Sequence, residues 1–284
     1  MSDAAVRLAA LHAYPVKSCA GVALERALLV ETGIEFDRHW MLVDADRRFV
    51  TQRELPRMAL VRPALRHADM VLRAPGMLAL HVALDAVESA CRVRVWKDEV
   101  GAYDMGDLAA QWFSDFLGRP LRLVRFDPEQ KRLSNARWTG GIAAENAFSD
   151  GYPLLVVSQS SLDELNRRLA GAGAPAATLE RLRPNLVLEG LDAHGEDAID
   201  ELAFDTPQGA VRLKMAKPCA RCAIPDVDPR TGETGHAVGD ALAAYRADAR
   251  LDGAITFGMY AVIAEGLERE LAVGMAGGAT WRFE

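Results

Sequence analysis

The hydrophobic positions of the first hundred residues come in short runs that are either apolar throughout or alternate between apolar and polar. Turn-forming residues separate these runs, for example at 31–33 and at 74–76. Several short strands at this spacing are typical of a β-barrel or β-sandwich rather than of βαβ units. A hairpin turn is predicted at 44–48. The predicted strands span 6–14, 27–30, 39–43, 60–64, 78–83 and 91–96.

A helical period follows this β-rich region. Its first segment predicts a helix over 107–117 with Asp104 or Asp107 as N-cap. A second helix is predicted over 158–169, capped by Ser160 or Ser161, and a shorter third helix over 240–246. The apolar stripe of the first helix consists of Leu108, Trp112, Phe113, Phe116 and Leu117.

Strand-like runs return in the second half of the chain, at 185–188, 210–215, 255–263 and 280–283. Residues 127–147 show neither period, which predicts a long functional or mobile loop. The whole pattern predicts a mainly β protein with a few helices, an α+β chain rich in barrel-like strands.

Composition and charge limit the classes of function. With 284 residues, half of them hydrophobic and about a quarter charged, the chain can form one large or two ordinary domains. A net charge of −7 argues against a nucleic-acid-binding protein. The N-terminus lacks the pattern of a signal peptide, and no apolar run reaches the ~18 residues of a membrane span. We therefore expect a cytoplasmic protein with no membrane segment, whose thiols stay reduced.

Two of the four cysteines, Cys219 and Cys222, stand close together in the stretch 217–222. Lys217 and Arg221 add positive charge beside them, and positive charge favours the thiolate, the form that reacts and binds metals. The pattern indicates a soft, anionic or redox-active ligand at this point of the chain.

The residues around the pair leave several readings open. A structural zinc site needs four ligands, whereas Cys19, Cys91 and the nearest histidine, His236, have no partner at ligand spacing. A thioredoxin-like dithiol normally opens a helix, whereas Pro225 and Pro229 follow here. Two ordinary buried cysteines remain an alternative.

Other segments offer donors for an anion. Lys17 and Ser18 follow a predicted strand, Arg38 interrupts an apolar stretch, and Arg183 precedes another strand. The turn at Asp150 exposes backbone N–H groups together with Gly151. Each signal also has an ordinary explanation: Lys17 as a solvated lysine, Asp37 and Arg38 as a surface ion pair.

Together these segments resemble the MOSC superfamily, the fold shared with the C-terminal domain of molybdenum cofactor sulfurases. Residues 14–18 and 36–40 resemble the family's N-terminal β-barrel domain. The MOSC domain is resembled by 149–153, 183–185, 219–222 and 228–232, and the segment 257–260 also fits. The architecture is similar to that of mitochondrial amidoxime-reducing components and bacterial reductases of N-hydroxylated bases. The resemblance implies a β-barrel-like domain over 1–125 packed on a MOSC β-barrel domain over 126–284.

The resemblance also implies a molybdenum cofactor, molybdopterin with one protein thiolate on the metal. Residue-by-residue matching gives that role to Cys222, with Cys219 as its neighbour. One thiolate suffices in such a site because the pterin dithiolene brings the other sulfur ligands. The residues implied for the pterin and phosphate pocket are Lys17, Ser18, Arg38, Asp150, Gly151, Tyr152, Arg183 and Asn185.

The implied activity is the reduction of N-hydroxylated small molecules: amidoximes, hydroxylamines and N-hydroxylated bases. The sequence carries no iron–sulfur cysteines after the MOSC motifs, so we expect a separate electron-transfer protein, ferredoxin- or cytochrome b5-like, with its reductase. The alternatives are a carrier of molybdenum cofactor or persulfide sulfur without turnover, and a β-barrel protein that has lost its cofactor.

Overall fold

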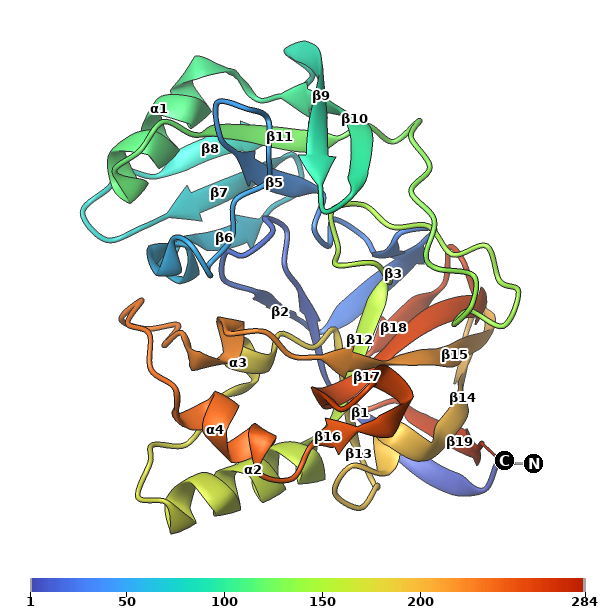
Figure 1. Ribbon diagram of the computed structural model, residues 1–284. Helices are drawn as coiled ribbons and strands as arrows, with labels where there is room; N and C mark the ends of the chain where they lie inside the picture. Colours follow the sequence, from blue (N-terminus) through green and yellow to red (C-terminus); the bar gives the residue numbers. More distant parts are fainter. Residues whose placement is uncertain (1, 283–284) are drawn as a thin grey trace.

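A closed β-barrel forms the larger part of the molecule in the computed structural model, which describes residues 2–282 (Figure 1). Seven strands follow one another in hydrogen-bonded order, and the first pairs with the last to close the ring. In ring order they are β12 (Leu154–Ser158), β13 (Leu186–Glu189), β1 (Ala4–Ala13), β19 (Ala276–Trp281), β14 (Ile199–Thr206), β15 (Gly209–Ala220) and β17 (Ala254–Glu265). The predicted mainly β architecture is confirmed.

Short strands extend the barrel at its edges. β2 (Val22–Leu24) pairs with β1, and β16 (Ala247–Asp248) pairs with β17. A separate three-stranded sheet has the order β18 (Glu270–Ala272), β3 (Arg26–Val30) and β4 (Gly33–Ile34). In these sheets, segments from both ends of the chain lie side by side.

A second, smaller β region lies beyond the barrel, at the top of Figure 1. One of its sheets has the order β5 (Trp40–Val43), β11 (Arg122–Phe126), β10 (Asp98–Asp104) and β9 (Ser89–Val95). The other has the order β6 (Arg62–Leu65), β7 (Asp69–Arg73) and β8 (Leu80–Ala83). Helix α1 (Gly106–Leu117) packs on these sheets.

The predicted boundary near residue 125 stays a prediction. The structure adds that β1, the first strand of the chain, pairs antiparallel with β13 and β19 inside the barrel. The barrel is therefore built from the first strand together with strands that follow residue 153.

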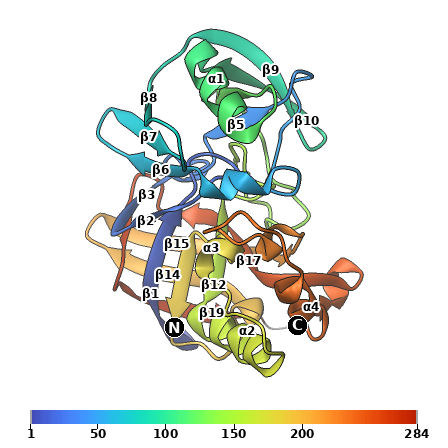
Figure 2. The same cartoon turned by 90° about the vertical axis from the view of Figure 1, so that its left-hand side faces the viewer.

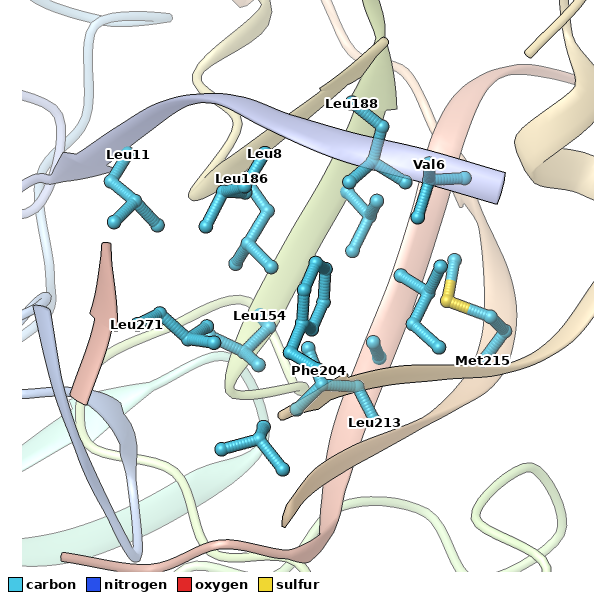
Figure 3. Packing of buried hydrophobic residues seen from close by; sticks show 14 of the residues in the cluster. Val6, Leu8, Leu11, Leu154, Leu186, Leu188, Phe204, Leu213, Met215 and Leu271 are labelled. Atoms are coloured by element: carbon cyan, nitrogen blue, oxygen red, sulfur yellow. The ribbon is translucent and has the colours of Figure 1, made fainter. Parts of the chain in front are cut away.

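The barrel interior is filled by side chains from most of its strands (Figure 3). Phe204 of β14 is 1 % exposed, and its ring points into the centre of this cluster. Leucines of β1, β12, β13 and β15 surround it because alternate residues of each strand face inward. The interior is a packed core, so any ligand site must lie outside the barrel.

Helices α2 (Gln159–Gly171), α3 (Leu179–Leu182) and α4 (Ala237–Ala243) gather on one side of the barrel (Figure 2). The N-cap of α2 is Ser158, whose hydroxyl accepts the N–H of Ser161. The predicted caps Ser160 and Ser161 are wrong, because their hydroxyls bind the Leu191 carbonyl and Glu196 instead.

Helix α1 also corrects the prediction in part. Its buried face carries Trp112, Phe113 and Phe116, as expected, whereas Leu108 is 76 % exposed. Leu108 lies about 100° around the helix from Ala109, which takes the inward position. The predicted Asp104 cap is wrong as well, since no side chain caps this helix and the N-cap position is Met105.

The prediction missed five longer strands, 69–73, 98–104, 122–126, 154–158 and 199–206. The last predicted strand runs to Phe283, which lies outside the described residues. The aperiodic stretch 127–147 contains neither helix nor strand, as predicted, and one bridge between Leu133 and Glu145 folds it back on itself.

Candidate functional site

A cleft between the smaller β region and one end of the barrel brings together the candidate residues from five separate segments. Its volume is about 720 Å³ when the open solvent at its mouth is included. Of the ten residues implied by the sequence, nine line it, and only Gly151 does not. Those nine are Lys17, Ser18, Arg38, Asp150, Tyr152, Arg183, Asn185, Cys219 and Cys222.

Two arginines form one wall of the cleft around a buried tyrosine. The guanidinium carbons of Arg38 and Arg183 lie 4.4 and 4.3 Å from the ring centroid of Tyr14. The Tyr14 hydroxyl donates to the Pro184 carbonyl oxygen at 3.2 Å, which ties the ring to the strand that follows Arg183. Tyr14 thus holds two like charges close together by cation–π contact.

The first of these arginines is compensated by a buried carboxylate. Arg38 Nη1 donates to both oxygens of Asp37 at 2.7 and 2.6 Å, and to Asn185 Oδ1 at 3.1 Å. The side chain of Asp37 is only 1 % exposed, so the pair is not the surface ion pair that the sequence left open. Asp37 also accepts the Tyr14 N–H at 2.7 Å and so fixes the turn that carries Arg38.

The second arginine has no such compensation. Arg183 is buried and donates through Nη1 to the Cys19 carbonyl oxygen at 2.7 Å, while its Nη2 has no partner in the protein. Burial and the neighbouring charge of Arg38 lower the pKa of Arg183 to about 10. A buried guanidinium with a free donor is typical of an anion site awaiting its ligand.

Backbone strain marks the same residues. Ser18, Arg38 and Arg183 all have left-handed backbone angles, with φ of 65°, 53° and 60°. Residues other than glycine adopt this region at a cost of about 1 kcal/mol or more, and such residues cluster at binding and catalytic sites. In Arg183 the angle ends helix α3 and turns the chain into β13.

The opposite wall is an ion pair between Lys17 and Asp150. Lys17 Nζ donates to the Asp150 carboxylate and, at 2.8 Å, to the Phe148 carbonyl oxygen. Burial lowers the pKa of Lys17, although Asp150 opposes that effect. The Asp150 side chain is 46 % exposed, so partial desolvation raises its pKa only weakly, and the charge of Lys17 holds that pKa below the ordinary value. Lys17 is therefore not the solvated lysine of the ordinary reading.

The two cysteines lie at the end of β15, in unequal environments. Cys219 is buried and its sulfur accepts a hydrogen bond from Arg221 Nη1 at 3.2 Å, whereas Cys222 is exposed at the cleft. Arg221 also donates to the Leu182 carbonyl oxygen at 2.9 Å, and its buried Nε has no protein partner. Cys222 is thus the thiol that can reach a ligand in the cleft.

The charge of the cleft is strongly positive. Its lining residues include five cations and one carboxylate. Three of the arginines, Arg53, Arg183 and Arg221, form no ion pair within 4 Å among residues 2–282. The cations are Lys17, Arg38, Arg53, Arg183 and Arg221, and the carboxylate is Asp150. This slot lies in a chain whose net charge is −7, so it is suited to an anionic ligand.

The turn at 149–153 is held by the aperiodic segment before it. Buried Arg132 donates to the carbonyl oxygens of Ala147 and Ser149 at 3.1 and 2.7 Å. Asn146 Nδ2 donates to the Gly151 carbonyl oxygen at 3.2 Å. Gly151 therefore contributes its backbone conformation, with φ of 134°, and no surface in the cleft.

Sequence reasoning missed several residues of the cleft. Arg53 reaches it from the turn at 52–54, and Tyr260 of β17 stacks on Tyr152 with ring centroids 5.0 Å apart. The tyrosine pair supplies the wall expected from Tyr152. Arg53 stands in no local pattern that would have revealed it. The segment of Tyr260 fits the family pattern, but its place in the cleft was not predicted, because β17 meets the turn at 149–153 only in the folded barrel.

Within 2–282, no group of three or more His, Cys, Asp or Glu residues is arranged to hold a metal ion. None of the helices there has the length and apolarity to cross a bilayer.

Two family models match the chain. Residues 5–120 match the MOSC N-terminal beta barrel domain, and residues 143–276 match the MOSC domain. Human mitochondrial amidoxime reducing component 2 is 32 % identical over 234 residues, which cover 79 % of this chain and 68 % of that protein. The chain belongs to the MOSC family.

Other MOSC-family relatives place the chain within a wider group. Bovine mitochondrial amidoxime reducing component 2 is 35 % identical over 231 residues, which cover 78 % of this chain. The chain spans about two thirds of the length of these relatives, 66 % for the bovine protein. Human molybdenum cofactor sulfurase is 29 % identical over 267 residues, 88 % of this chain and 29 % of that protein.

Proposed function

We propose that this MOSC-family protein binds a molybdenum cofactor in the cleft and uses it to reduce N-hydroxylated compounds, with electrons from a separate protein. The substrates would be small molecules such as amidoximes, hydroxylamines and N-hydroxylated bases. One observation carries the proposal: an exposed thiol, Cys222, shares a cleft with an unpaired cluster of arginines. The relatives named as amidoxime-reducing components support the reaction class.

The cleft fits the charge of such a cofactor. A molybdopterin carries a phosphate, and the free donors of Arg183 and Arg221 are suited to its oxygens. Removing a buried, unpaired guanidinium donor from water costs about 1–3 kcal/mol, which an anion would offset. Asn185 and Ser18 add polar groups beside the two arginines that sandwich Tyr14.

The thiols fit as well. A single protein thiolate can ligate molybdenum only if the cofactor brings further sulfur ligands, and Cys222 is the exposed thiol of the pair. Cys219 is buried and bound by Arg221, so its part would be to position the strand end that carries Cys222. When bound, the cofactor supplies two-electron redox chemistry, whereas the residues of the cleft bind it, orient it and keep its charge compensated.

The experiment that tests the ligand assignment is metal analysis of purified protein. We expect stoichiometric molybdenum in the wild-type protein and in Cys91→Ala, a matched control outside the cleft, and its loss in Cys222→Ala. Equal molybdenum in all three proteins would refute the assignment of Cys222. Turnover of benzamidoxime by the loaded protein with reduced methyl viologen tests the reaction itself.

A second candidate is a carrier of molybdenum cofactor or persulfide sulfur. The similarity to molybdenum cofactor sulfurase over 88 % of the chain favours it. Loaded protein that shows no turnover with any reductant, but transfers cofactor to an apoenzyme, would decide for the carrier. The cytoplasmic location stays a prediction from the sequence.

A further inference from the structure

A cluster of arginines lies on the smaller β region and is not used by the proposed function. Arg47 and Arg48 stand in the turn after β5, and Arg92 and Arg94 share one face of strand β9 beside it. The Arg94 N–H donates to the Arg47 carbonyl oxygen at 2.8 Å, and the Phe49 N–H donates to the Arg94 carbonyl oxygen at 3.0 Å. Because these bonds join the two segments, the four arginines form one surface, called here the arginine patch.

The patch is positive in a chain that is acidic as a whole. Its shallow depression also contains two carboxylates, Asp46 and Glu99. Glu99 pairs with Arg92 at 2.6 Å and reaches Arg94 at 4.0 Å, and Arg47 pairs with buried Asp104 at 3.0 Å. Arg48 has no carboxylate within 4 Å among the described residues, so it is the uncompensated charge of the patch. The side chains of Arg92 and Arg94 are 63 % and 59 % exposed. Exposed charge of this kind steers association more than it stabilises the fold.

An exposed aromatic residue extends the patch toward the cleft. Trp96, in the turn of the β9–β10 hairpin, is 45 % exposed and packs on Phe49 with ring centroids 4.9 Å apart. The Arg53 guanidinium lies 4.7 Å from the centroid of the Trp96 ring. Tryptophan and arginine are the residue types that contribute most binding energy at protein interfaces. Strand β9 runs from the top of the molecule down toward the barrel, so the turn of the hairpin lies on the barrel side of the smaller β region (Figure 1).

The same residues touch the cleft. Trp96 Nε1 donates to Asp150 Oδ1 at 3.2 Å, and Lys17 Nζ lies 5.7 Å from the centroid of Phe49. Arg53 lines the cleft directly. A molecule seated on Trp96 and the patch therefore lies one side chain away from the wall formed by Lys17 and Asp150.

We propose that the arginine patch, with Trp96, is the docking surface for a small acidic electron-transfer protein. This rests on the proposed function, because only a reductase needs such a donor. The donor would deliver two electrons in two one-electron steps, and each step oxidises one molecule of the reduced donor protein. The two electrons, together with two protons from water, convert an N–OH group of the substrate to N–H and release one water molecule. Transient redox complexes bury little surface and rely on complementary charge, which an arginine-rich rim around one tryptophan provides.

The test reverses the charges of two arginines of the patch, Arg48 and Arg94. The double variant Arg48→Glu/Arg94→Glu is compared with Arg48→Lys/Arg94→Lys, which keeps the charge, and with Arg167→Glu on helix α2. The probes are an acidic [2Fe–2S] ferredoxin and the soluble haem domain of cytochrome b5, and binding is measured by calorimetry at low ionic strength. We expect one of the two probes to bind, the reversal to weaken that binding about tenfold or more, and both controls to bind like wild type.

Kinetics separate docking from chemistry. In the reversed variant, kcat/KM with the protein donor should fall about tenfold and lose its salt dependence. Turnover with reduced methyl viologen should stay at the wild-type rate. Absence of binding to both probes, or equal binding by the reversed variant, would overturn the docking surface. Loss of turnover with methyl viologen in wild-type protein would instead defeat the proposed function.

A nucleic acid is the other polyanion that such a patch could hold. If the wild-type protein binds single-stranded DNA but neither acidic donor, and if charge reversal abolishes the DNA binding, the proposal is overturned as well.

Discussion

Arg183 offers the sharpest test of the anion site, because replacing it should stabilise the ligand-free protein. Burial and Arg38 lower its pKa from the ordinary 12.5 to about 10. Since one pKa step corresponds to 1.36 kcal/mol, the charged side chain costs the fold about 3 kcal/mol. Arg183→Met removes that cost. It also leaves the Cys19 carbonyl oxygen without its donor and removes the cation–π contact with Tyr14, losses that together cost about 1–2 kcal/mol. The expected net gain is about 1–2 kcal/mol.

The assay is thermal and denaturant unfolding of metal-free protein. For a chain of this length a gain of 1–2 kcal/mol raises the melting midpoint by about 2–5 °C. Inorganic phosphate at ten times its dissociation constant should stabilise the wild type by about 1.4 kcal/mol, and Arg183→Met much less. The exposed Arg167→Met serves as the control and should show neither effect.

Two outcomes would refute this reasoning. If Arg183→Met lowers the free energy of unfolding by more than about 1 kcal/mol, the guanidinium is a structural donor rather than a strained ligand. If phosphate stabilises the variant as much as the wild type, the anion binds elsewhere.

Further predictions concern thiols, core and pH. In a Cys91→Ser background, native protein should react rapidly with one equivalent of a thiol reagent, at exposed Cys222, and rapid labelling of buried Cys219 would contradict the assignment. Phe204→Ala should lower the free energy of unfolding by about 3–5 kcal/mol in urea titrations, and a loss below 1 kcal/mol would mean that the barrel centre is loosely packed. Burial lowers the pKa of His39 to about 4, so the folded state binds fewer protons than the unfolded state between pH 4 and 6.5 and loses stability as the pH falls through that window. His39→Gln should flatten this slope, measured as the unfolding free energy at pH 7 and pH 5, and an unchanged slope would exclude His39 as its source.

The sequence predicted features that depend on residues close together in the chain, and it missed features that depend on contacts between distant residues. Helices α1 and α2 were predicted to within a few residues because their apolar stripes are local signals. The cap of α2 was missed because Ser160 and Ser161 find distant partners, Leu191 and Glu196, which no local pattern reveals. Strand β12 is buried at every position, so alternation could not mark it.

The candidate site shows the same division. Motif matching brought out nine of the residues that line the cleft, since backbone turns and arginines leave short signatures. It could not show that the neighbouring Asp37 and Arg38 are buried together, because that burial depends on contacts with Tyr14, 23 residues before Asp37. Nor could it show that Tyr14 lies between two guanidiniums, because Tyr14 and the segment of Arg183 are far apart in the chain. Arg53 leaves no signature in the sequence, and the motif at 257–260 did not show that Tyr260 faces the cleft.

The sequence by itself determined the residue chemistry: a mainly β chain, two close cysteines, scattered cations and an acidic balance. Only the tertiary structure decided how these residues differ from one another. In the folded chain Cys219 is buried and Cys222 is exposed. Arg38 is paired with Asp37, whereas one donor of Arg183 has no partner in the protein. The physical reason is that solvent access and charge compensation depend on neighbours in space, which closure of the barrel brings together from both ends of the chain.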